Sequence, residues 1–153
     1  TWSTGTNFQQ MDFYFENADL SDSSRRKAII HVSLDADLPV VRVDFDLNSL
    51  PYNELTGFEV VAQFKVDNFN QSSTFWTDSN GMEMQERHLN YRPTWDLQAN
   101  YNDSLQNVTA NYFPINSAIS MKDGDMQFTV MNDRPQAGSS LEAGKIEFMQ
   151  NRR

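Results

Sequence analysis

The sequence predicts an all-β protein built as an antiparallel sandwich, and three observations support this fold class. Apolar and polar residues alternate with period two in several short runs, which is typical of strands with one buried face. Gly, Asn and Pro separate these runs at turn positions. No stretch of ten or more residues has a clear helical periodicity. About ten short strands joined by turns favour an antiparallel sandwich.

The expected strands follow one another along the chain. Alternation over 11–16 and 41–47 predicts two half-buried strands, and the apolar run at 28–32 predicts another between them. The segment 82–90 fits either an edge strand or one or two helical turns. The remaining expected strands, which are rich in aromatic and β-branched residues, cover 58–66, 74–77, 110–115, 118–121, 126–131 and 145–149.

Residues that favour tight turns or loops lie between these expected strands. Asn80-Gly81 is the pair that tolerates a type I′ hairpin turn, so a tight hairpin is expected there. Residues 122–125 offer similar chemistry, and the polar segments 17–27 and 98–111 are typical of loops.

The length, charge and cysteine content of the chain exclude several classes of function. The chain has 153 residues, no cysteine, and a net charge of −9 from 12 Lys plus Arg against 21 Asp plus Glu. The length predicts a single β-sandwich domain over 1–153, and we expect it to be an excerpt of a longer protein because it stops directly after an alternating run. The acidic balance argues against nucleic-acid and anionic-membrane partners. The lack of cysteine excludes disulfides, thiol nucleophiles and Cys-ligated zinc.

The sequence contains no self-contained catalytic set. A metal-binding role for His31 stays open, but a structural role is favoured because a zinc site without Cys needs several converging ligands, and His88 is expected to be solvated. Asp44 and Asp46 project from one strand face and fit either acid–base chemistry or the wet face of a sheet. The run 138–142 breaks the Gly-x-Ser-x-Gly pattern of a nucleophile elbow at its last position.

Three Asn-x-Ser/Thr sequences lie in expected loops. A loop leaves room for a glycan, so their position supports them as glycosylation candidates. They begin at Asn70, Asn102 and Asn107.

Two stretches carry a resemblance to a known family. The sequences FWTDSNGMEMQ at 75–85 and NYRPTW at 90–95 resemble the C-terminal half of family 38 glycoside hydrolases, and within it the lysosomal-type α-mannosidases. The resemblance covers about residues 40–153, and it continues through 110–116, 123–127 and 132–141 to the end of the chain.

The resemblance implies an antiparallel β-super-sandwich of the galactose-mutarotase type. It also implies a parent α-mannosidase that cleaves terminal α-mannosides with retention, using a zinc ion and an aspartate nucleophile. Both groups belong to the N-terminal catalytic part of the family, so this segment alone is expected to be inactive and to bind no metal. The implied partners are that catalytic part and mannose-containing glycans, and the implied location is the lysosome or the secretory pathway.

The resemblance also suggests roles for individual residues. It implies that Arg152 and Arg153 form a wall of the substrate pocket rather than acting as catalysts, with a solvated strand end as the alternative. Residues expected to pack against the catalytic part are Tyr91, Trp95, Tyr112, Phe113, Asp133 and Arg134. A free-standing carbohydrate-binding sandwich is the alternative function, in which sugars would stack on Trp76, Trp95 and Tyr91.

Overall fold

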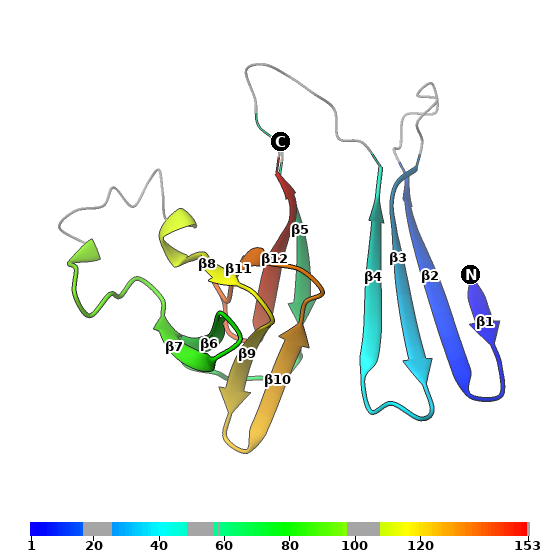
Figure 1. Cartoon of the computed structure of the whole chain (residues 1–153), viewed down its shortest axis with the longest axis horizontal. Helices are drawn as coiled ribbons and strands as arrows, with labels where there is room; N and C mark the ends of the chain where they lie inside the picture. Colours follow the sequence, from blue (N-terminus) through cyan, green and yellow to red (C-terminus); the bar gives the residue numbers. More distant parts are fainter. Residues whose placement is uncertain (17–25, 49–56, 58, 98–107, 153) are drawn as a thin grey trace. The chain divides into compact units, whose positions relative to one another are not determined.

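The computed structural model describes residues 1–16, 26–48, 57, 59–97 and 108–152, and antiparallel strands make up most of them (Figure 1). The strands form three four-stranded sheets. A single 3₁₀ turn, η1 (Thr109–Asn111), precedes one of the strands. The predicted all-β antiparallel fold is confirmed. By its internal contacts the chain divides into two compact units, Thr1–Phe58 and Glu59–Arg153, which are described separately.

Unit 1 is one sheet with the strand order β1-β2-β3-β4. Its long strands lie side by side in Figure 1, and they correspond to the predicted strands at 11–16, 28–32 and 41–47. The first strand has only three residues, too few for a pattern in the sequence. The bounds are β1 Trp2–Thr4, β2 Phe8–Glu16, β3 Arg26–Asp35 and β4 Val41–Leu47.

Unit 2 contains the other two sheets. The first has the order β10-β9-β6-β7, with β6 Thr74–Ser79, β7 Glu83–His88, β9 Ala118–Asp123 and β10 Met126–Met131. The second has the order β5-β12-β11-β8, with β5 Glu59–Lys65, β8 Phe113–Ile115, β11 Gln136–Ser139 and β12 Lys145–Arg152.

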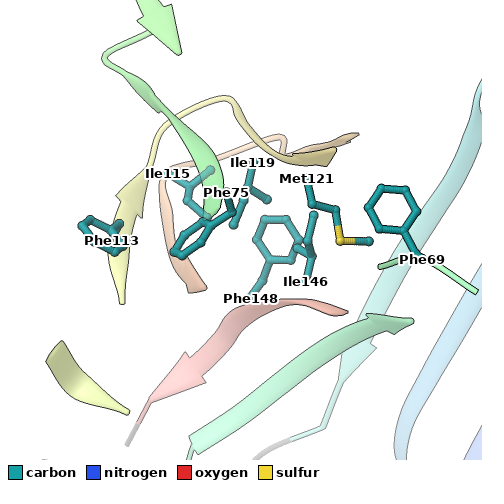
Figure 2. Packing of buried hydrophobic residues seen from close by; sticks show 8 residues of the cluster. All are labelled: Phe69, Phe75, Phe113, Ile115, Ile119, Met121, Ile146 and Phe148. Carbon is teal, nitrogen blue, oxygen red and sulfur yellow. The ribbon is translucent and has the colours of Figure 1, made fainter. Parts of the chain in front are cut away.

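The core of unit 2 takes side chains from both of its sheets, as a sandwich requires. In Figure 2 the side chains of Ile146 and Phe148, from β12, point toward those of Phe75 and Ile119, from β6 and β9. Burial of these side chains is the main stabilising contribution of the unit. The buried cluster consists of Phe69, Phe75, Phe113, Ile115, Ile119, Met121, Ile146 and Phe148.

The structure resolves the alternatives left open for 82–90, because β7 is a strand that pairs antiparallel with β6. The hairpin between them has the predicted type I′ character. Asn80 and Gly81 have φ angles of 51° and 71°, and the amide of Met82 donates to the carbonyl oxygen of Ser79 at 2.9 Å.

Two details in the second sheet differ from the sequence prediction. The strand expected over 110–115 begins only at Phe113, because η1 precedes it and the buried side chain of Asn111 bonds to Asn90. Strand β11 was not predicted because its small residues show no alternation. Its Gly138 is needed for close packing, since an added Cβ would lie 2.4 Å from Cδ1 of Ile115 and 2.6 Å from the carbonyl oxygen of Glu147.

Candidate functional site

An open hollow lies on the loop that follows β7, and residues 90–97 line it. Tyr91 and Trp95 are 55% and 51% exposed, so both rings present a large part of their surface. Asn90, Thr94 and Asp96 add polar groups to the lining. Exposed aromatic rings beside polar groups suit contact with a protein surface or with a sugar ring. We treat the hollow as the candidate functional site.

Asparagine side chains anchor the start of this loop. Asn90 has a φ of 56°, in the left-handed region that Asn tolerates better than most residues. Its backbone N–H donates to Oδ1 of Asn111 at 2.8 Å, and Nδ2 of Asn111 donates back to Oδ1 of Asn90 at 2.8 Å. Because Asn111 is buried, this reciprocal pair fixes the position at which the chain leaves β7.

Arg92 holds the next part of the loop. Its guanidinium donates to the carbonyl oxygen of Tyr91 at 2.8 Å and to that of Ala110. It also lies over the ring of Phe113, with Cζ 4.4 Å from the ring centroid. These contacts of Arg92 hold the backbone of the loop that carries Tyr91 and Trp95.

Phe113 lies beneath this anchor rather than at the surface. The ring is 7% exposed, and it meets Phe75 edge to face with centroids 5.6 Å apart. A second guanidinium, that of Arg87, lies over it at 4.6 Å and donates to Oγ1 of Thr77 at 2.9 Å. Burial lowers the pKa of Arg87, and the nearby charge of Arg92 lowers it further. The ring of Phe113 is thus already covered by residues of unit 2.

Asp78 is a buried residue whose carboxylate accepts hydrogen bonds from backbone N–H groups. The sequence analysis did not single it out. Its Oδ1 accepts the backbone N–H groups of Asn116, Ser117 and Ala118 at 2.8, 2.9 and 3.1 Å. Its Oδ2 accepts that of Gly81 at 2.9 Å. Burial raises the pKa of Asp78, but the four backbone donors outweigh this and hold it well below its usual range. The carboxylate joins the β6–β7 turn to the start of β9. The available signal in the sequence was an Asp two residues before the Asn80-Gly81 pair.

Tyr112 and Arg152 both contact acidic residues of the second sheet. The half-buried hydroxyl of Tyr112 donates to Glu147, and burial together with this bond raises the pKa of Tyr112 above its usual range. Nε of Arg152 lies 3.0 Å from Oε1 of Glu59, and the arginine side chain is 72% exposed. Arg153 lies outside the described residues.

Asp133 and Arg134 form an exposed ion pair in the connection between β10 and β11. Nη2 of the arginine lies 2.6 Å from Oδ2 of the aspartate, and both side chains are 72% exposed. The hydrogen bonds and charge of the arginine lower the pKa of Asp133. The pair is accessible to a partner from solvent.

Trp76 differs from the two aromatic residues of the hollow. It is half-buried on β6, and Nζ of Lys122 lies 4.8 Å from its ring centroid. A cation therefore already occupies one face of this ring. Tyr91 and Trp95 offer more free surface for stacking.

Of the three glycosylation candidates, Asn70 is described. Its side chain is exposed, and its backbone N–H donates to Oδ2 of Asp123 at 2.7 Å. Asn102 and Asn107 lie outside the described residues.

The histidines have nearby polar partners. Nδ1 of His31 lies 2.8 Å from Oδ1 of Asp12, and hydrogen bonds from Gln10 and His31 lower the pKa of Asp12. Nε2 of His88 lies 2.8 Å from Glu86. Throughout the part of the chain that the structure describes, no three His, Asp or Glu side chains gather as metal ligands would.

The paired aspartates of β4 lie on the polar face of unit 1. Asp44 pairs with the exposed Arg42 at 2.8 Å, and both it and Asp46 point to the face of the sheet that also carries His31. Within the described ranges, no helix has the length and apolar character to cross a bilayer.

The fold and its loops thus define an all-β segment, and comparison with known proteins identifies its family. Residues 6–153 match the C-terminal domain of glycosyl hydrolases family 38. The chain belongs to this family.

Several relatives are lysosomal alpha-mannosidases. The protein from Bos taurus is 41% identical over 113 residues, which cover 74% of this chain and 11% of the relative. The one from Homo sapiens is 39% identical with the same coverage. A probable alpha-mannosidase from Arabidopsis thaliana is 37% identical over 113 residues, or 74% of this chain and 10% of the relative. The chain therefore spans about a tenth of the length of these relatives.

Proposed function

We propose that this chain is a non-catalytic β-sandwich segment of a retaining, zinc-dependent α-mannosidase that hydrolyses terminal α-mannose from glycans. The family match over residues 6–153 carries this proposal. The names of the relatives support the parent activity, and the lysosomal ones support a location in the lysosome or the secretory pathway. We further propose that residues 1–153 belong to one super-sandwich of the galactose-mutarotase type.

The described residues do not fit a zinc site, so the proposal assigns the zinc to the rest of the enzyme. The contacts of His31 with Asp12 and of His88 with Glu86 each bring together one imidazole and one carboxylate. A zinc site built from nitrogen and oxygen ligands needs at least three protein groups. The role of this chain is then support of the catalytic part and of its pocket.

We propose that the hollow at 90–97 packs against the catalytic part of the same enzyme. Tyr91 and Trp95 would supply the apolar contact, and the exposed pair Asp133–Arg134 a polar one. Tyr112, whose hydroxyl donates to Glu147, would take part in the same contact with the catalytic part. Exposed aromatic side chains on an anchored loop are typical anchors of an interface. Phe113 is left out of this contact because its ring is buried in unit 2.

We propose that Arg152 and Arg153 line the substrate pocket of the parent enzyme. The exposed guanidinium of Arg152, at the end of β12, is available to hydroxyl groups of a sugar. In the full-length enzyme, Arg152→Gln should raise the KM for an aryl α-mannoside several-fold and change kcat little. Arg42→Gln, at another exposed arginine in an ion pair, is the matched control and should change neither.

The main test compares two proteins: the full-length family 38 protein that contains this chain, and the chain alone. The full-length protein should hydrolyse an aryl α-mannoside, lose activity with a chelator, and release mannose of retained configuration by NMR. The chain alone should show no turnover. An inactive full-length protein would refute the parent function, whereas turnover by the chain alone would refute its non-catalytic role.

Variants of the hollow test the packing proposal. Tyr91→Ser and Trp95→Ser should lower the unfolding midpoint of the full-length enzyme and reduce its activity, while Met82→Ser, at an 87% exposed turn residue, should not. A carbohydrate-binding module is the second candidate function, and the exposure of the same two rings favours it. Calorimetric binding of mannose-rich glycans by the chain alone, lost in Trp95→Ser, would support the module and contradict the packing proposal.

A further inference from the structure

The sheet of unit 1 has one face that is almost wholly apolar. In the register, Val32 lies opposite Met11 and Val43, and directly opposed residues share a face. Two positions toward one end, Ile30 lies opposite the apolar Phe13 and Phe45, whereas toward the other end Leu34 lies opposite the apolar Val41 and the polar Gln9. We call this surface the apolar face. Its members are Trp2, Met11, Phe13, Phe15, Ala28, Ile30, Val32, Leu34, Val41, Val43, Phe45 and Leu47.

The other face of the same sheet is polar. His31 lies opposite Asp12 and Asp44, and Ser33 lies opposite Gln10 and Arg42 in the adjoining row. This face carries the Arg42–Asp44 ion pair and the His31–Asp12 contact, which suit a surface in water. The contrast between the two faces indicates that the sheet is built to be covered on one side only.

The apolar face is comparable in size to the largest apolar patch of a typical monomer. Four strands about 4.8 Å apart and rows of side chains about 7 Å apart give it a footprint of about 14 by 20 Å, or about 300 Å². Contiguous apolar patches of this size are often functional. Several of its side chains remain substantially exposed, among them Phe13 at 45%, Phe15 at 51% and Val41 at 59%. A single sheet without a second layer has no core of its own.

We infer that the apolar face is covered by a second sheet of the same family 38 protein, formed by residues outside this chain. This inference rests on the proposed function. The matched region is 11% of the bovine relative, so most of such a protein is available to supply the layer. The face carries no charged residue among its members, so the covering surface is itself apolar. A single helix, about 10 Å wide, would cover only part of the four strands, whereas a facing sheet matches their full width.

Two neighbouring residues of β2 provide a matched test. Phe13 belongs to the apolar face and Tyr14 to the polar face, and their exposures in the chain are 45% and 44%. The chain has no cysteine, so Phe13→Cys and Tyr14→Cys each introduce a unique thiol. The measurement is the rate of maleimide labelling at the introduced position, followed by mass spectrometry of the peptide, in the chain alone and in the full-length protein.

The thiol at position 13 should be labelled at least about tenfold more slowly in the full-length protein than in the chain alone, because a packed layer admits the reagent only through opening. The thiol at position 14 should be labelled at similar rates in both. The pair Val41→Cys and Arg42→Cys on β4 repeats the comparison if the loss of Phe13 prevents folding.

Three results would overturn the inference. Equal, fast labelling at position 13 in both proteins would mean that nothing covers the face. Slow labelling already in the chain alone, at every protein concentration, would mean that the chain covers its own face. Slow labelling in the chain only at high concentration would identify a second copy as the occupant. The labelling readout does not require mannosidase activity, so an inactive full-length protein would refute the proposed function without deciding this test.

Discussion

Replacing Asp78 by asparagine tests whether its carboxylate holds two segments of unit 2 together. The side chain is 5% exposed and accepts four backbone N–H groups. An asparagine oxygen turned toward residues 116–118 keeps three of these acceptor positions. Its NH₂ group then faces the N–H of Gly81, so that bond is lost. The three remaining bonds lose the assistance of the negative charge.

The magnitude follows from typical hydrogen-bond energies. Bonds to a charged acceptor contribute about 1 kcal/mol more than neutral ones, so the three weakened bonds cost about 3 kcal/mol. The lost charged bond to Gly81 costs about 2 kcal/mol more, for about 5 kcal/mol in all. Removing a buried charge returns several kcal/mol of desolvation energy, taken as about 2–3 kcal/mol here. Asp78→Asn should therefore lower the free energy of unfolding by about 2–3 kcal/mol at pH 7.

The pH dependence provides a second measure of the same interaction. The folded-state pKa of Asp78 lies below its usual value, so its ionised form stabilises the fold above the unfolded pKa. This stability is lost as the pH falls toward the folded pKa. The wild-type chain should therefore lose stability below about pH 4, and the difference from Asp78→Asn should narrow there.

Urea unfolding of the 153-residue chain at pH 7 and at pH 3 measures both effects, with the m-value as a check that the folded state is unchanged. Asp44→Asn is the control, because Asp44 is an exposed aspartate paired with Arg42, and it should leave the midpoint at pH 7 unchanged. An Asp78→Asn midpoint equal to that of wild type at pH 7 would refute the reasoning. So would a difference that stays constant on acidification.

Three further predictions concern separate parts of the chain. Gly138→Ala should destabilise the chain by about 2 kcal/mol in urea unfolding, because the new methyl group would overlap Ile115 and the backbone of Glu147; wild-type stability would contradict the packing argument. Arg92→Lys should lower the free energy of unfolding by about 1 kcal/mol and shift the tryptophan fluorescence, because lysine cannot reproduce the bidentate contact with two carbonyl groups. An unchanged spectrum and an unchanged unfolding midpoint would refute the role of Arg92 as an anchor. Asn70→Gln should remove one N-glycan from protein secreted by a glycosylating host, and an unchanged intact mass would exclude this site.

Local patterns in the sequence predicted most of the strands, because a half-covered sheet requires alternation within each strand. Val41–Leu47 and the Asn80-Gly81 turn were predictable from a few neighbouring residues. What could not be predicted depends on partners far apart in the chain. Asp78 bonds to residues 38 to 40 positions away, and Tyr112 bonds to Glu147 at a separation of 35. No local pattern encodes such pairs.

The candidate site shows the same division between local and distant information. Tyr91 and Trp95 were identifiable as aromatic residues in a loop, and the structure describes both as exposed. The sequence analysis placed Phe113 with them because it is another aromatic residue in a stretch that resembles the family. Only the three-dimensional contacts with Phe75 and Arg87 reveal that its ring is covered.

The residues that carry the family resemblance explain why similarity transfers the fold more securely than the chemistry. In the stretch 75–85, Asp78 and Asn80 satisfy backbone and turn requirements, and in 90–95, Asn90 and Arg92 anchor a loop to the chain at 110–111. These side chains are occupied by bonds within unit 2. Identity at such positions preserves the sandwich and its turns, because losing them would leave buried polar groups unpaired. In the function proposed above, catalysis by the parent enzyme depends on groups outside this chain, and the chain supplies surfaces that support them.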